Sequence, residues 1–426
     1  MKELTNQRSA KPRALIAMSG GVDSSVSALL MHQAGYDCAG VTMRLIDDSY
    51  LEPSSDLNHS INSDSACQVV RQGDVKLDTP HSRQPLPDTD AQAQDARAVC
   101  DRLGIPHYSL DLTDAFTEYV VQPFMAGYLC GETPNPCITC NRHIKFDLLW
   151  QKMLELDFDV LVTGHYARCL PVSEEGKGEQ VPMGKDPLGR NSEYGIFRSL
   201  STDKDQSYVL WPLQRERLAR MRFPLGELQK SEVREIARQN GLGLVVAEKP
   251  ESQDICFIPH GDHAAFIEHF ANLRPADLEG PIIDSDGNTL GQHQGLYRYT
   301  IGQRKGLGVA VGEPLYVYDI DSADNTLRVG RDEALYRDSV SLRELNLLAE
   351  LPINQGIAIQ AQYRYASSAH PATLYIEDTV SGFQARVHFD EPQKAISPGQ
   401  SLVCYQGERV VAGGVIDKRY SEFYSI

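Results

Sequence analysis

Residues 19–25, with the sequence SGGVDSS, combine residue types that suit a bound phosphate group. Glycines let the backbone approach an anion closely, and the N–H groups at the start of a following helix point towards it. The hydroxyls of Ser24 and Ser25 add donors, and the Asp23 carboxylate suits Mg²⁺, directly or through water. The loop does not end in Gly-Lys-Ser/Thr, so it is not a Walker A loop and lacks the lysine that reaches the β- and γ-phosphates. If these residues bind no phosphate, the same sequence is simply a glycine-rich turn before a serine-capped helix.

Three cysteines form the second set of reactive residues. Cys137 and Cys140 make a CxxC sequence after two prolines, and Cys256 lies far along the chain in the stretch ESQDICFI at 251–258. A thiolate near Lys or Arg, or at a helix start, has a lowered pKa and is nucleophilic, and Cys140 is followed by an Asn-Arg pair and a predicted helix. The CxxC pair is also compatible with zinc or iron–sulfur ligation. A structural zinc requires four ligands, and no second CxxC or close His pair completes that set.

The elements that must position these residues predict the start of a parallel α/β sheet. Residues 13–18 predict an apolar strand, 24–34 a helix and 38–43 a second strand, which places the loop between a strand and a helix. Further predicted elements are helices at 91–103 and 143–156, strands near 106–111 and at 159–163, and a hairpin or loop at 171–193. Residues from about 49 to 92 show no sustained period and predict a long loop or disordered insertion.

The second half of the chain has a different character. A predicted, largely helical stretch at 212–240 is rich in cations, namely Arg215, Arg217, Arg220, Arg222, Lys230, Arg234 and Arg238. From about 280 onward, short β-like runs separated by turn residues predict a small β-barrel or sandwich. We therefore predict three domains: a catalytic α/β domain at 1–220, a central domain at 221–330 and a C-terminal β-barrel domain at 331–426.

Composition limits the classes of protein to which this chain can belong. With 426 residues, 41% hydrophobic and 23% charged, it has the composition of a globular protein of more than one domain. A formal net charge of -17 argues against general coating of nucleic acid but permits a local basic face, such as 212–240, unless that stretch is simply a solvated helix face. Nine cysteines without a paired framework indicate reduced thiols. No apolar stretch has membrane-spanning length and no secretory signal begins the chain, so we expect a cytoplasmic protein without a membrane partner.

Several distinctive strings occur together in this chain: AMSGGVDSS, TPNPCITCN followed by HIKF, TGHYAR, DKDQSYVL and SQDICF, then GQHQGLYRYTIGQRKGLG and SPGQ. By these strings the chain resembles the bacterial tRNA-specific 2-thiouridylases, the MnmA/TrmU family, within the PP-loop ATP pyrophosphatase superfamily. The resemblance covers nearly all residues except about 50–90 and the ends. It implies an α/β fold with a parallel-sheet PP-loop domain (adenine nucleotide alpha hydrolase-like), a small mixed domain that binds tRNA, and a C-terminal β-barrel. Residues 245–261 would return to the active site of the first domain, which carries an insertion at about 50–90.

The resemblance implies an ATP-dependent thiotransferase that acts on the wobble uridine, U34, of tRNAs for Lys, Glu and Gln. With ATP and Mg²⁺ at the loop, AMP would be transferred to the uridine O2 and later displaced by sulfur. Cys256 is implied as the cysteine that carries a persulfide, loaded by a sulfur-carrier protein or a cysteine desulfurase, and Cys140 as the nucleophile. These two cysteines would pair as a disulfide, so they must approach each other in the fold.

The resemblance also implies binding residues by position. The ATP contacts would be Ala17, Met18, Ser19, Gly20, Gly21, Val22, Asp23, Ser24, Met43 and Gly164. The tRNA contacts would be Asn135, Pro136, Cys137, His165, Lys204, Asp205, Gln206, Arg364, Tyr365 and Gln400, of which the first three face the target base. Tyr297, Arg298 and Tyr299 are further candidates to contact an RNA loop, because RNA bases are often read on aromatic or arginine planes.

One residue departs from the family pattern. Many relatives carry Asp, cast as an acid or base, where this chain has Cys137. A thiol with an ordinary pKa of about 8.5 does not simply replace it as a proton donor at pH 7. Either that role is dispensable, or Cys137 joins Cys140 and Cys256 around an iron–sulfur cluster, as in a cluster-dependent tRNA thiolase. A PP-loop amidating ligase, against which the cysteine motifs speak, and a tRNA-binding protein without activity are the competing functions.

Overall fold

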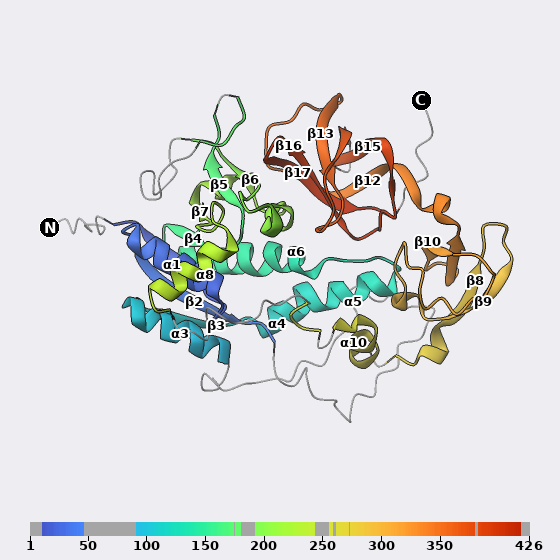
Figure 1. Cartoon of the computed structure of the whole chain (residues 1–426), viewed down its shortest axis with the longest axis horizontal. Helices are drawn as coiled ribbons and strands as arrows, with labels where there is room; N and C mark the ends of the chain where they lie inside the picture. Colours follow the sequence, from blue (N-terminus) through green and yellow to red (C-terminus); the bar gives the residue numbers. More distant parts are fainter. Residues whose placement is uncertain are drawn as a thin grey trace, which may run out of the picture.

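The computed structural model describes residues 11–46, 91–173, 175–179, 192–242, 255–258, 261–271, 273–379 and 382–418. The expected insertion at about 50–90 and most of 245–261 lie outside the described residues. The described part is built around three β-sheets, with most of its helices on the first (Figure 1). No helix among these residues is long and apolar enough to cross a membrane.

The first sheet is parallel and has the strand order β3-β2-β1-β4-β7. Its strands are β1 (Arg13–Ala17), β2 (Asp37–Arg44), β3 (His107–Asp111), β4 (Val160–Val162) and β7 (Met221–Arg222). The centre of β1 is apolar because helices cover both of its faces: Ala14 and Ile16 pack on one side and Leu15 on the other, all fully buried. The strands predicted for β1, β2, β3 and β4 are confirmed.

Helices cover both faces of this sheet. α1 (Val22–Gln33), α3 (Ala91–Leu103) and α8 (Lys230–Gln239) pack on one face, and α7 (Leu149–Glu155) packs on the other. The other helical segments of this part are α4 (Thr113–Phe116), η3 (Thr117–Val121), α5 (Gln122–Leu129), α6 (Pro136–Cys140), η4 (Asn141–Leu148), η5 (Thr202–Lys204), η6 (Ser207–Leu210) and η7 (Arg215–Arg220). The predicted helix at 143–156 is divided into the π-helix η4 and the α-helix α7.

The stretch at 212–240 differs from its prediction. Its helical part is in two pieces, the 3-10 helix η7 and the helix α8, and the short strand β7 lies between them. Residues 221–242, which the sequence pattern assigns to the central domain, lie in the first layer, because β7 pairs with β4 and α8 packs against α1.

The strand order creates a crevice at the carboxyl ends of β1 and β4. β1 pairs with β2 on one side and with β4, which comes much later in the chain, on the other. In open α/β sheets, ligands bind at such a switch point, where the loops that follow the two strands separate. The loop at 18–21 follows β1 and the loop at 163–167 follows β4, so both loops with predicted ATP contacts lie at this edge.

A four-stranded sheet with the order β10-β11-β8-β9 forms the second part. It consists of β8 (Glu279–Ile283), β9 (Thr289–Gln294), β10 (Tyr316–Asp321) and β11 (Thr326–Gly330), with the short helices η9 (Pro275–Leu278), η10 (Leu296–Arg298) and η11 (Asp332–Leu335) beside them. Before this sheet, α10 (His263–Phe270) packs with α5 and η3 in one apolar cluster. The sequence pattern predicts β10 and β11 but misses β8 and β9, whose Gly and Pro residues are rare in strands.

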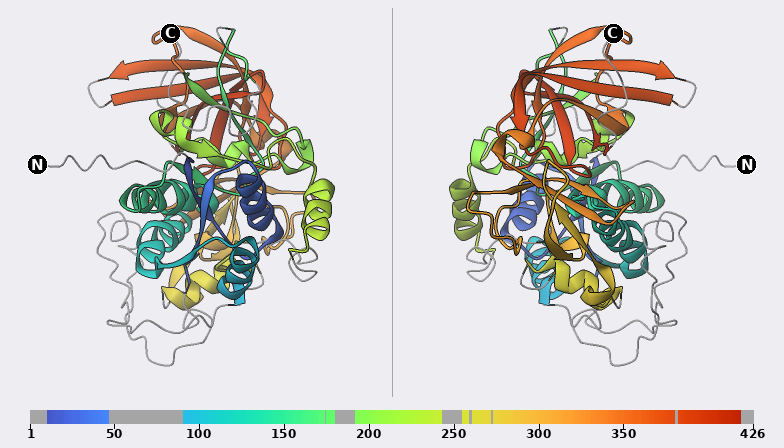
Figure 2. Two further views of the ribbon diagram at one scale, coloured as in Figure 1. Left: turned by 90° about the vertical axis from the view of Figure 1, so that its left-hand side faces the viewer. Right: turned by 90° about the vertical axis from the view of Figure 1, so that its right-hand side faces the viewer.

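Six strands close into a barrel: β12 (Tyr336–Leu347), β13 (Gly356–Gln362), β14 (His370–Thr379), β15 (Gly382–Lys394), β16 (Ser401–Gln406) and β17 (Arg409–Ile416). The order β12-β15-β14-β13-β16-β17 is closed by pairing of β12 with β17, and closure pairs the edge strands of the barrel. A hairpin of β5 (Arg168–Pro171) and β6 (Tyr194–Phe197) extends this sheet through β17 and ties the first part to the barrel (Figure 2). The predicted α/β class and β-barrel are confirmed.

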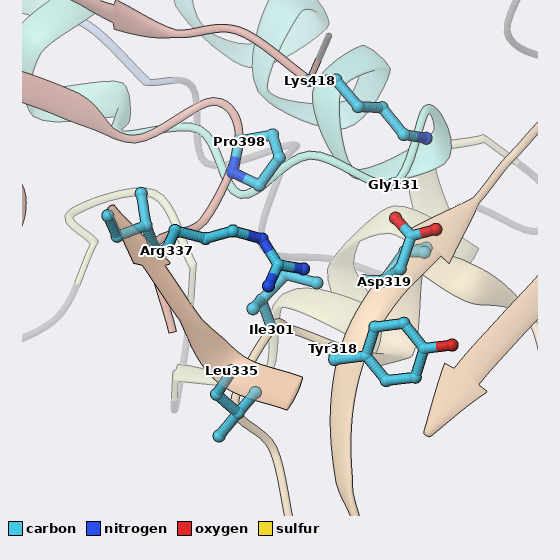
Figure 3. Close-up of a pocket in the computed structure, with 10 residues that line it drawn as sticks. Gly131, Ile301, Tyr318, Asp319, Leu335, Arg337, Pro398 and Lys418 are labelled. Atoms are coloured by element: carbon cyan, nitrogen blue, oxygen red, sulfur yellow. The ribbon is translucent and has the colours of Figure 1, made fainter. Parts of the chain in front are cut away.

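The three parts meet around a small cavity (Figure 3). Gly131 after α5, Asp319 on β10 and Arg337 on β12 line it, and Arg337 and Asp319 point towards the same space. Gly131 has a φ of +74°, and a Cβ there would lie 2.7 Å from the Ile320 side chain, so this close approach requires glycine. The cavity has a volume of about 10 Å³, which is room for about one water molecule, so the three parts pack closely here.

Candidate active site

The loop after β1 has the geometry of an anion-binding turn. Gly20 has a φ of +67°, and a Cβ there would lie 2.4 Å from the Gln92 carbonyl oxygen, so the turn requires glycine. Ser24 and Ser25 donate their hydroxyls to the Gly21 carbonyl at 3.1 and 2.8 Å, which closes the turn on itself. Gly21 is the N-cap of α1 and no side chain caps this helix, so its first N–H groups are available to an anion.

A lysine from a distant helix lies at this loop. Lys230, the first residue of α8, donates to both carboxylate oxygens of Asp23 at 2.8 and 2.7 Å, and Tyr166 donates its hydroxyl to the same carboxylate at 2.7 Å. The structure thus brings to the loop the lysine that its sequence lacks. This role of Lys230 could not be predicted from the sequence, because nothing near Lys230 in the chain links it to residues 19–25.

Asp23 also fits the ligands that Mg²⁺ prefers. Mg²⁺ is usually held by one or two carboxylates together with the phosphates of the substrate, and it keeps several waters. The Asp23 carboxylate is one-third exposed and shares its oxygens with Lys230. A metal-bound phosphate at this loop would therefore meet one negative and one positive side chain.

The predicted ATP contacts from three strands come together at this edge. Ala17 ends β1, Met43 lies near the end of β2, and the Met18 N–H donates to the Val41 carbonyl at 2.8 Å, which aligns the two strand ends. A Cβ at Gly164, after β4, would lie 3.0 Å from the Asp23 carbonyl carbon and 3.1 Å from its Cβ. Gly164 therefore allows the β4 loop to lie directly against the start of α1.

Two residues of the DKDQ string hold this second loop. Gln206 accepts from the Tyr166 N–H at 2.9 Å and donates its own N–H to the Tyr166 carbonyl at 2.7 Å. Asp205 accepts from the N–H groups of Ser199 and Ser207 at 3.0 and 3.1 Å, and pairs with Arg198 at 3.0 Å. Asp205 and Gln206 therefore position the β4 loop, and their contact with tRNA, like that of half-buried Lys204, stays a prediction.

The CxxC sequence lies on a short, capped helix. Asn135 is the N-cap of α6 and its side-chain oxygen accepts from the Cys137 N–H at 3.1 Å, while Pro136 takes the first helical turn, where its missing N–H is not needed. Cys137 is exposed and Cys140 is buried, with both as free thiols. The helix thus presents one thiol outward and places the other in the core.

Cys256 approaches Cys140 because the residue after it is an aromatic anchor. Phe257 is buried and packs edge to face on Phe116 and Phe124, with ring centroids 5.6 and 5.4 Å apart. These rings share one apolar cluster with Cys140. Cys256 itself remains exposed and is a free thiol. The expected approach of Cys140 and Cys256 is found, whereas a disulfide between them stays a prediction.

The electrostatics of the thiols correct one expectation. Burial, followed by the neighbouring thiols of Cys140 and Cys137, raises the pKa of Cys256 to about 12. Burial also raises the pKa of Cys140 and of Cys137, and the charge of Lys145 opposes this rise at all three. The expectation of a lowered pKa at Cys140 is therefore wrong, because desolvation of the thiolate outweighs the nearby cation.

His165 lies in the loop after β4, which packs against the start of α1, and the Lys145 charge that acts on the thiols also acts on it. Its ring is buried between Phe146 and Phe223, with centroids 5.9 and 6.0 Å away, and its Nδ1 is 2.6 Å from the Thr163 hydroxyl. Burial, with a contribution from Lys145, holds the pKa of His165 well below its usual value, so the ring is neutral at pH 7. Contact of His165 with tRNA stays a prediction.

The other predicted tRNA contacts lie where the barrel meets α6. Gln400 donates to the Thr133 carbonyl at 2.6 Å, and Arg343 on β12 forms a two-point ion pair with Glu132 at 3.0 and 2.7 Å. Arg364 donates to the Ala395 carbonyl, and Tyr365 beside it is 45% exposed, with its ring edge to face on Tyr208 at 6.0 Å between centroids. Contact of these residues with tRNA stays a prediction.

The cation-rich stretch is not a free basic face. Arg217 pairs with Asp147 at 2.7 Å, and Arg215 pairs with Glu193 at 3.1 Å. Arg220 donates to the Asp159 and Phe158 carbonyls, and Arg222 to the Ala219 and Met221 carbonyls. These arginines tie η7 and β7 to the first layer, and binding of RNA phosphates by the stretch at 212–240 stays a prediction.

The expectation that Tyr297 and Tyr299 contact an RNA loop is wrong, whereas that for Arg298, whose side chain is 33% exposed, stays a prediction. Tyr297 and Tyr299 are 1% and 7% exposed, so neither ring is available to stack on RNA. Tyr297 donates its hydroxyl to Glu268 at 2.8 Å, and Arg298 donates to the same carboxylate. These residues anchor the second sheet to α10.

The three thiols do not form a metal site as they stand. Within the residues that the structure describes, no group of three or more His, Cys, Asp or Glu side chains is arranged to hold a metal ion. An iron–sulfur cluster, expected as one possibility from Cys137, Cys140 and Cys256, therefore has no preformed ligand set in this part of the chain.

A phosphate loop at the switch point of a parallel sheet, with two thiols at the same edge, defines a nucleotide-dependent enzyme. The family model described as tRNA methyl transferase HUP domain matches residues 12–86 and 72–260. The tRNA methyl transferase PRC-barrel domain matches 265–331, and the aminomethyltransferase beta-barrel domain matches 337–416.

Curated relatives match along almost the whole chain. The protein of Carboxydothermus hydrogenoformans is 40% identical over 410 residues, which cover 96% of this chain and 98% of that protein. The protein of Acidithiobacillus ferrooxidans is 41% identical over 96% of this chain and 99% of that protein, and that of Clostridioides difficile is 36% identical over 95% and 98%. All three are named tRNA-specific 2-thiouridylase MnmA. This chain belongs to the tRNA-specific 2-thiouridylase (MnmA) family, as the resemblance predicts.

Proposed function

We propose that this chain catalyses the ATP-dependent 2-thiolation of the wobble uridine, U34, of tRNAs for Lys, Glu and Gln. The observation that carries the proposal is the approach of Cys256 to Cys140 beside the crevice of the phosphate loop. An amidating ligase has no use for such a thiol pair. The substrate is inferred from the tRNA-specific 2-thiouridylases to which the chain is related.

The first step activates the uridine. The N–H groups at the start of α1 and the Lys230 ammonium stabilise the negative charge of the ATP phosphates, and Asp23 would hold Mg²⁺ beside them, which neutralises further charge. The uridine O2 attacks the α-phosphate, AMP is joined to O2, and pyrophosphate leaves. A target base must leave its stack to reach this crevice, and the residues proposed to meet it are Asn135, Pro136 and Cys137, at the start of α6.

The second step transfers sulfur. The terminal sulfur of a Cys256 persulfide attacks C2, and AMP leaves with the electron pair of the C2–O2 bond. The Cys140 thiolate then attacks Sγ of Cys256, the bond between that atom and the transferred sulfur breaks, and its electron pair stays on the sulfur at C2. The products are 2-thiouridine and a Cys140–Cys256 disulfide, which an external thiol reductant must reduce before the next cycle.

Exposure of the two thiols matches these roles. Cys256 is exposed, so a persulfide-carrying protein or a cysteine desulfurase can load it. Cys140 is buried in the apolar cluster around Phe257, which shields it from unwanted oxidation. The partners are therefore tRNA and a protein that donates a persulfide.

The experiment separates adenylation from sulfur transfer. Purified protein is given ATP, Mg²⁺, tRNA transcript and a persulfide donor, and AMP formation and 2-thiouridine are both measured. Cys256→Ser and Cys140→Ser are each expected to lose 2-thiouridine while they keep AMP formation, because the phosphate loop does not use these thiols. Thiolation by Cys256→Ser from the persulfide donor contradicts the carrier role.

The cluster-dependent route has its own outcome in the same experiment. Protein purified without oxygen is assayed for iron and for visible absorbance. We expect full activity in iron-free protein. Activity that appears only with bound iron, and that Cys137→Asp abolishes, would replace the persulfide route with a cluster route, since a carboxylate is a harder ligand than a thiolate.

A further inference from the structure

Lys145 lies between two buried residues that face the thiol site. Ile144 packs in one apolar cluster with Cys140 and Phe257, and the Phe146 ring lies 5.9 Å from the His165 ring. Burial raises the pKa values of Cys137, Cys140 and Cys256, and the Lys145 charge opposes that rise at each of them. The same charge acts on His165, in the loop after β4. These four residues come from three separate segments, so Lys145 lies where the segments converge. Among the described residues, no carboxylate acts on any of the four groups.

The helix geometry accounts for the position of Lys145. Cys140 ends α6, and Lys145 follows in η4, a π-helix. A π-helical turn joins residues i and i+5, whereas an α-helical turn joins i and i+4. The wider turn therefore brings Lys145 back towards the side of the helix that carries Cys140. In a regular α-helix, with 3.6 residues per turn, the fifth residue points away.

We propose that Lys145 is a positioning residue for sulfur transfer, the counter-cation of the anionic sulfur atoms. The inference rests on the proposed function. In the first displacement, negative charge leaves the terminal persulfide sulfur of Cys256, and in the second it leaves the Cys140 thiolate. The ammonium group acts on both sulfurs through its charge and takes no part in bond formation, so it favours the reactive form of each in turn.

The site strengthens this effect. Buried surroundings make the interaction of a cation with a thiolate stronger than it is in water. The surrounding groups that titrate are Cys137, Cys140, Cys256 and His165, and the histidine is neutral at pH 7, so it does not compete for the anion. Without Lys145, burial and the neighbouring thiols decide the ionisation of Cys140 and Cys256, and both favour the protonated form.

The side chain at position 137 determines how strongly the Lys145 charge acts on the sulfur atoms. With Cys137 the position is uncharged at neutral pH, because burial raises the pKa of that thiol. A carboxylate at 137 would lie within reach of Lys145 and cancel part of its charge. We therefore expect Cys137→Asp to make Cys256 less reactive, in the same direction as loss of Lys145.

The experiment measures thiol reactivity apart from enzymatic activity. Iodoacetamide labelling of Cys256 is followed by peptide mass spectrometry from pH 7 to 10 in the full-length protein, for Lys145→Met, Lys145→Arg and the wild type. Methionine keeps the length of the apolar stem. Lys152→Met is the matched control, since Lys152 lies on α7, which continues the same helix, and pairs with Glu155.

Lys145→Met is expected to label roughly tenfold more slowly at pH 8, with its pH profile moved towards higher pH, because one charge at this range changes a pKa by about one unit. Lys145→Arg is expected to recover most of the rate, and Lys152→Met to match the wild type. The 2-thiouridine yield of Lys145→Met should fall while AMP formation stays unchanged.

Two results overturn the inference. One is an unchanged labelling rate and pH profile in folded Lys145→Met. The other is an equal loss in Lys145→Arg, which would assign Lys145 a role in packing alone. Labelling needs no tRNA, ATP or sulfur donor, so it can be interpreted whether or not the protein is active. A wild type that makes no 2-thiouridine would contradict the proposed function but not the role of Lys145.

Discussion

At the scale of single residues, the phosphate loop depends on a contact that the chain makes over a long distance. Asp23 belongs to the loop itself, but Lys230 and Tyr166, which hold its carboxylate, come from α8 and from the loop after β4. The ion pair is 13% exposed on the lysine side, so its charge is little screened by solvent. A loop without its own phosphate-binding lysine thus obtains one from the neighbouring helix.

We predict that Lys230→Met lowers AMP formation by roughly 100-fold, because the cation stabilises charge that develops on the phosphates. Asp23→Ala should abolish pyrophosphate release. Both variants should bind tRNA as the wild type does, since the RNA contacts predicted at the barrel are separate from this loop.

The matched control is Tyr166→Phe, which removes one hydrogen bond to Asp23 and leaves the ion pair in place. Its AMP formation should stay within about tenfold of the wild type, as for one hydrogen bond to a charged group. If Lys230→Met releases pyrophosphate at the wild-type rate, Lys230 serves only to neutralise Asp23.

At the scale of elements, the arginines of η7 and β7 act as ties within the protein. Arg217 donates to the Phe146 carbonyl and to Asp147, and its guanidinium lies 5.3 Å from the Trp150 ring centroid. It thereby links η7 to the helix that carries Cys140 and Lys145. Because its side chain is only 19% exposed, it has little surface left for a phosphate.

We predict that Arg217→Ala lowers the free energy of unfolding by about 2 kcal/mol, the scale for loss of a buried, charge-assisted hydrogen-bond set. The salt dependence of tRNA binding should not change. Arg238→Ala is the control, because Arg238 is 47% exposed and pairs only weakly with Glu235 at 3.4 Å, so we expect a change within about 0.5 kcal/mol. A smaller salt slope with unchanged stability would return Arg217 to the RNA face.

The barrel also ties itself to the loop that precedes α6. Gly399 lies so close to this loop that a Cβ there would be 2.9 Å from Cβ of Glu132 and 3.0 Å from the Thr133 nitrogen. With the Arg343–Glu132 ion pair, this contact joins the barrel to the helix that carries the thiols. A movement of the barrel on binding RNA would therefore be transmitted to α6.

At the scale of the whole molecule, buried titratable groups limit stability at both ends of the pH range. Burial lowers the pKa of His165 and, with less effect, of His143, His263 and His293. Burial raises the pKa of Cys38 to about 12 and that of Cys100 to about 11. Between the lowered histidine pKa values and the raised cysteine pKa values, these histidines and cysteines are all neutral in the folded protein.

We predict that the free energy of unfolding is highest between about pH 6.5 and 8.5, the ordinary pKa values of histidine and cysteine. Below about pH 6.5 the unfolded chain binds more protons than the folded protein, so stability falls as the pH falls. Above about pH 8.5 the unfolded thiols lose protons that the folded thiols keep, so stability falls as the pH rises. Urea unfolding from pH 5 to 10 under reducing conditions measures this, and a flat profile would contradict it.

The sequence by itself determined the local features. Apolar runs predicted β1, β2 and β4, because a strand buried on both faces must be apolar along its length. Short β-like runs predicted β3 and most barrel strands, which are only partly buried. The glycines of the phosphate loop could also be recognised from the sequence, because Gly20 adopts a positive φ that other residues avoid. The strings around Cys140 and Cys256 marked the thiol site and the family.

Only the tertiary structure decided which distant groups meet. Strand order brought the loop after β4 to the start of α1, and α8 brought Lys230 to Asp23. Burial reversed the expected ionisation of Cys140 and removed Tyr297 and Tyr299 from the surface. The arginines at 215–222 were taken up by internal ion pairs and hydrogen bonds. The physical reason is common to all of these: charge, burial and long-range contact depend on what packs against a residue, and a linear pattern records only what precedes and follows it.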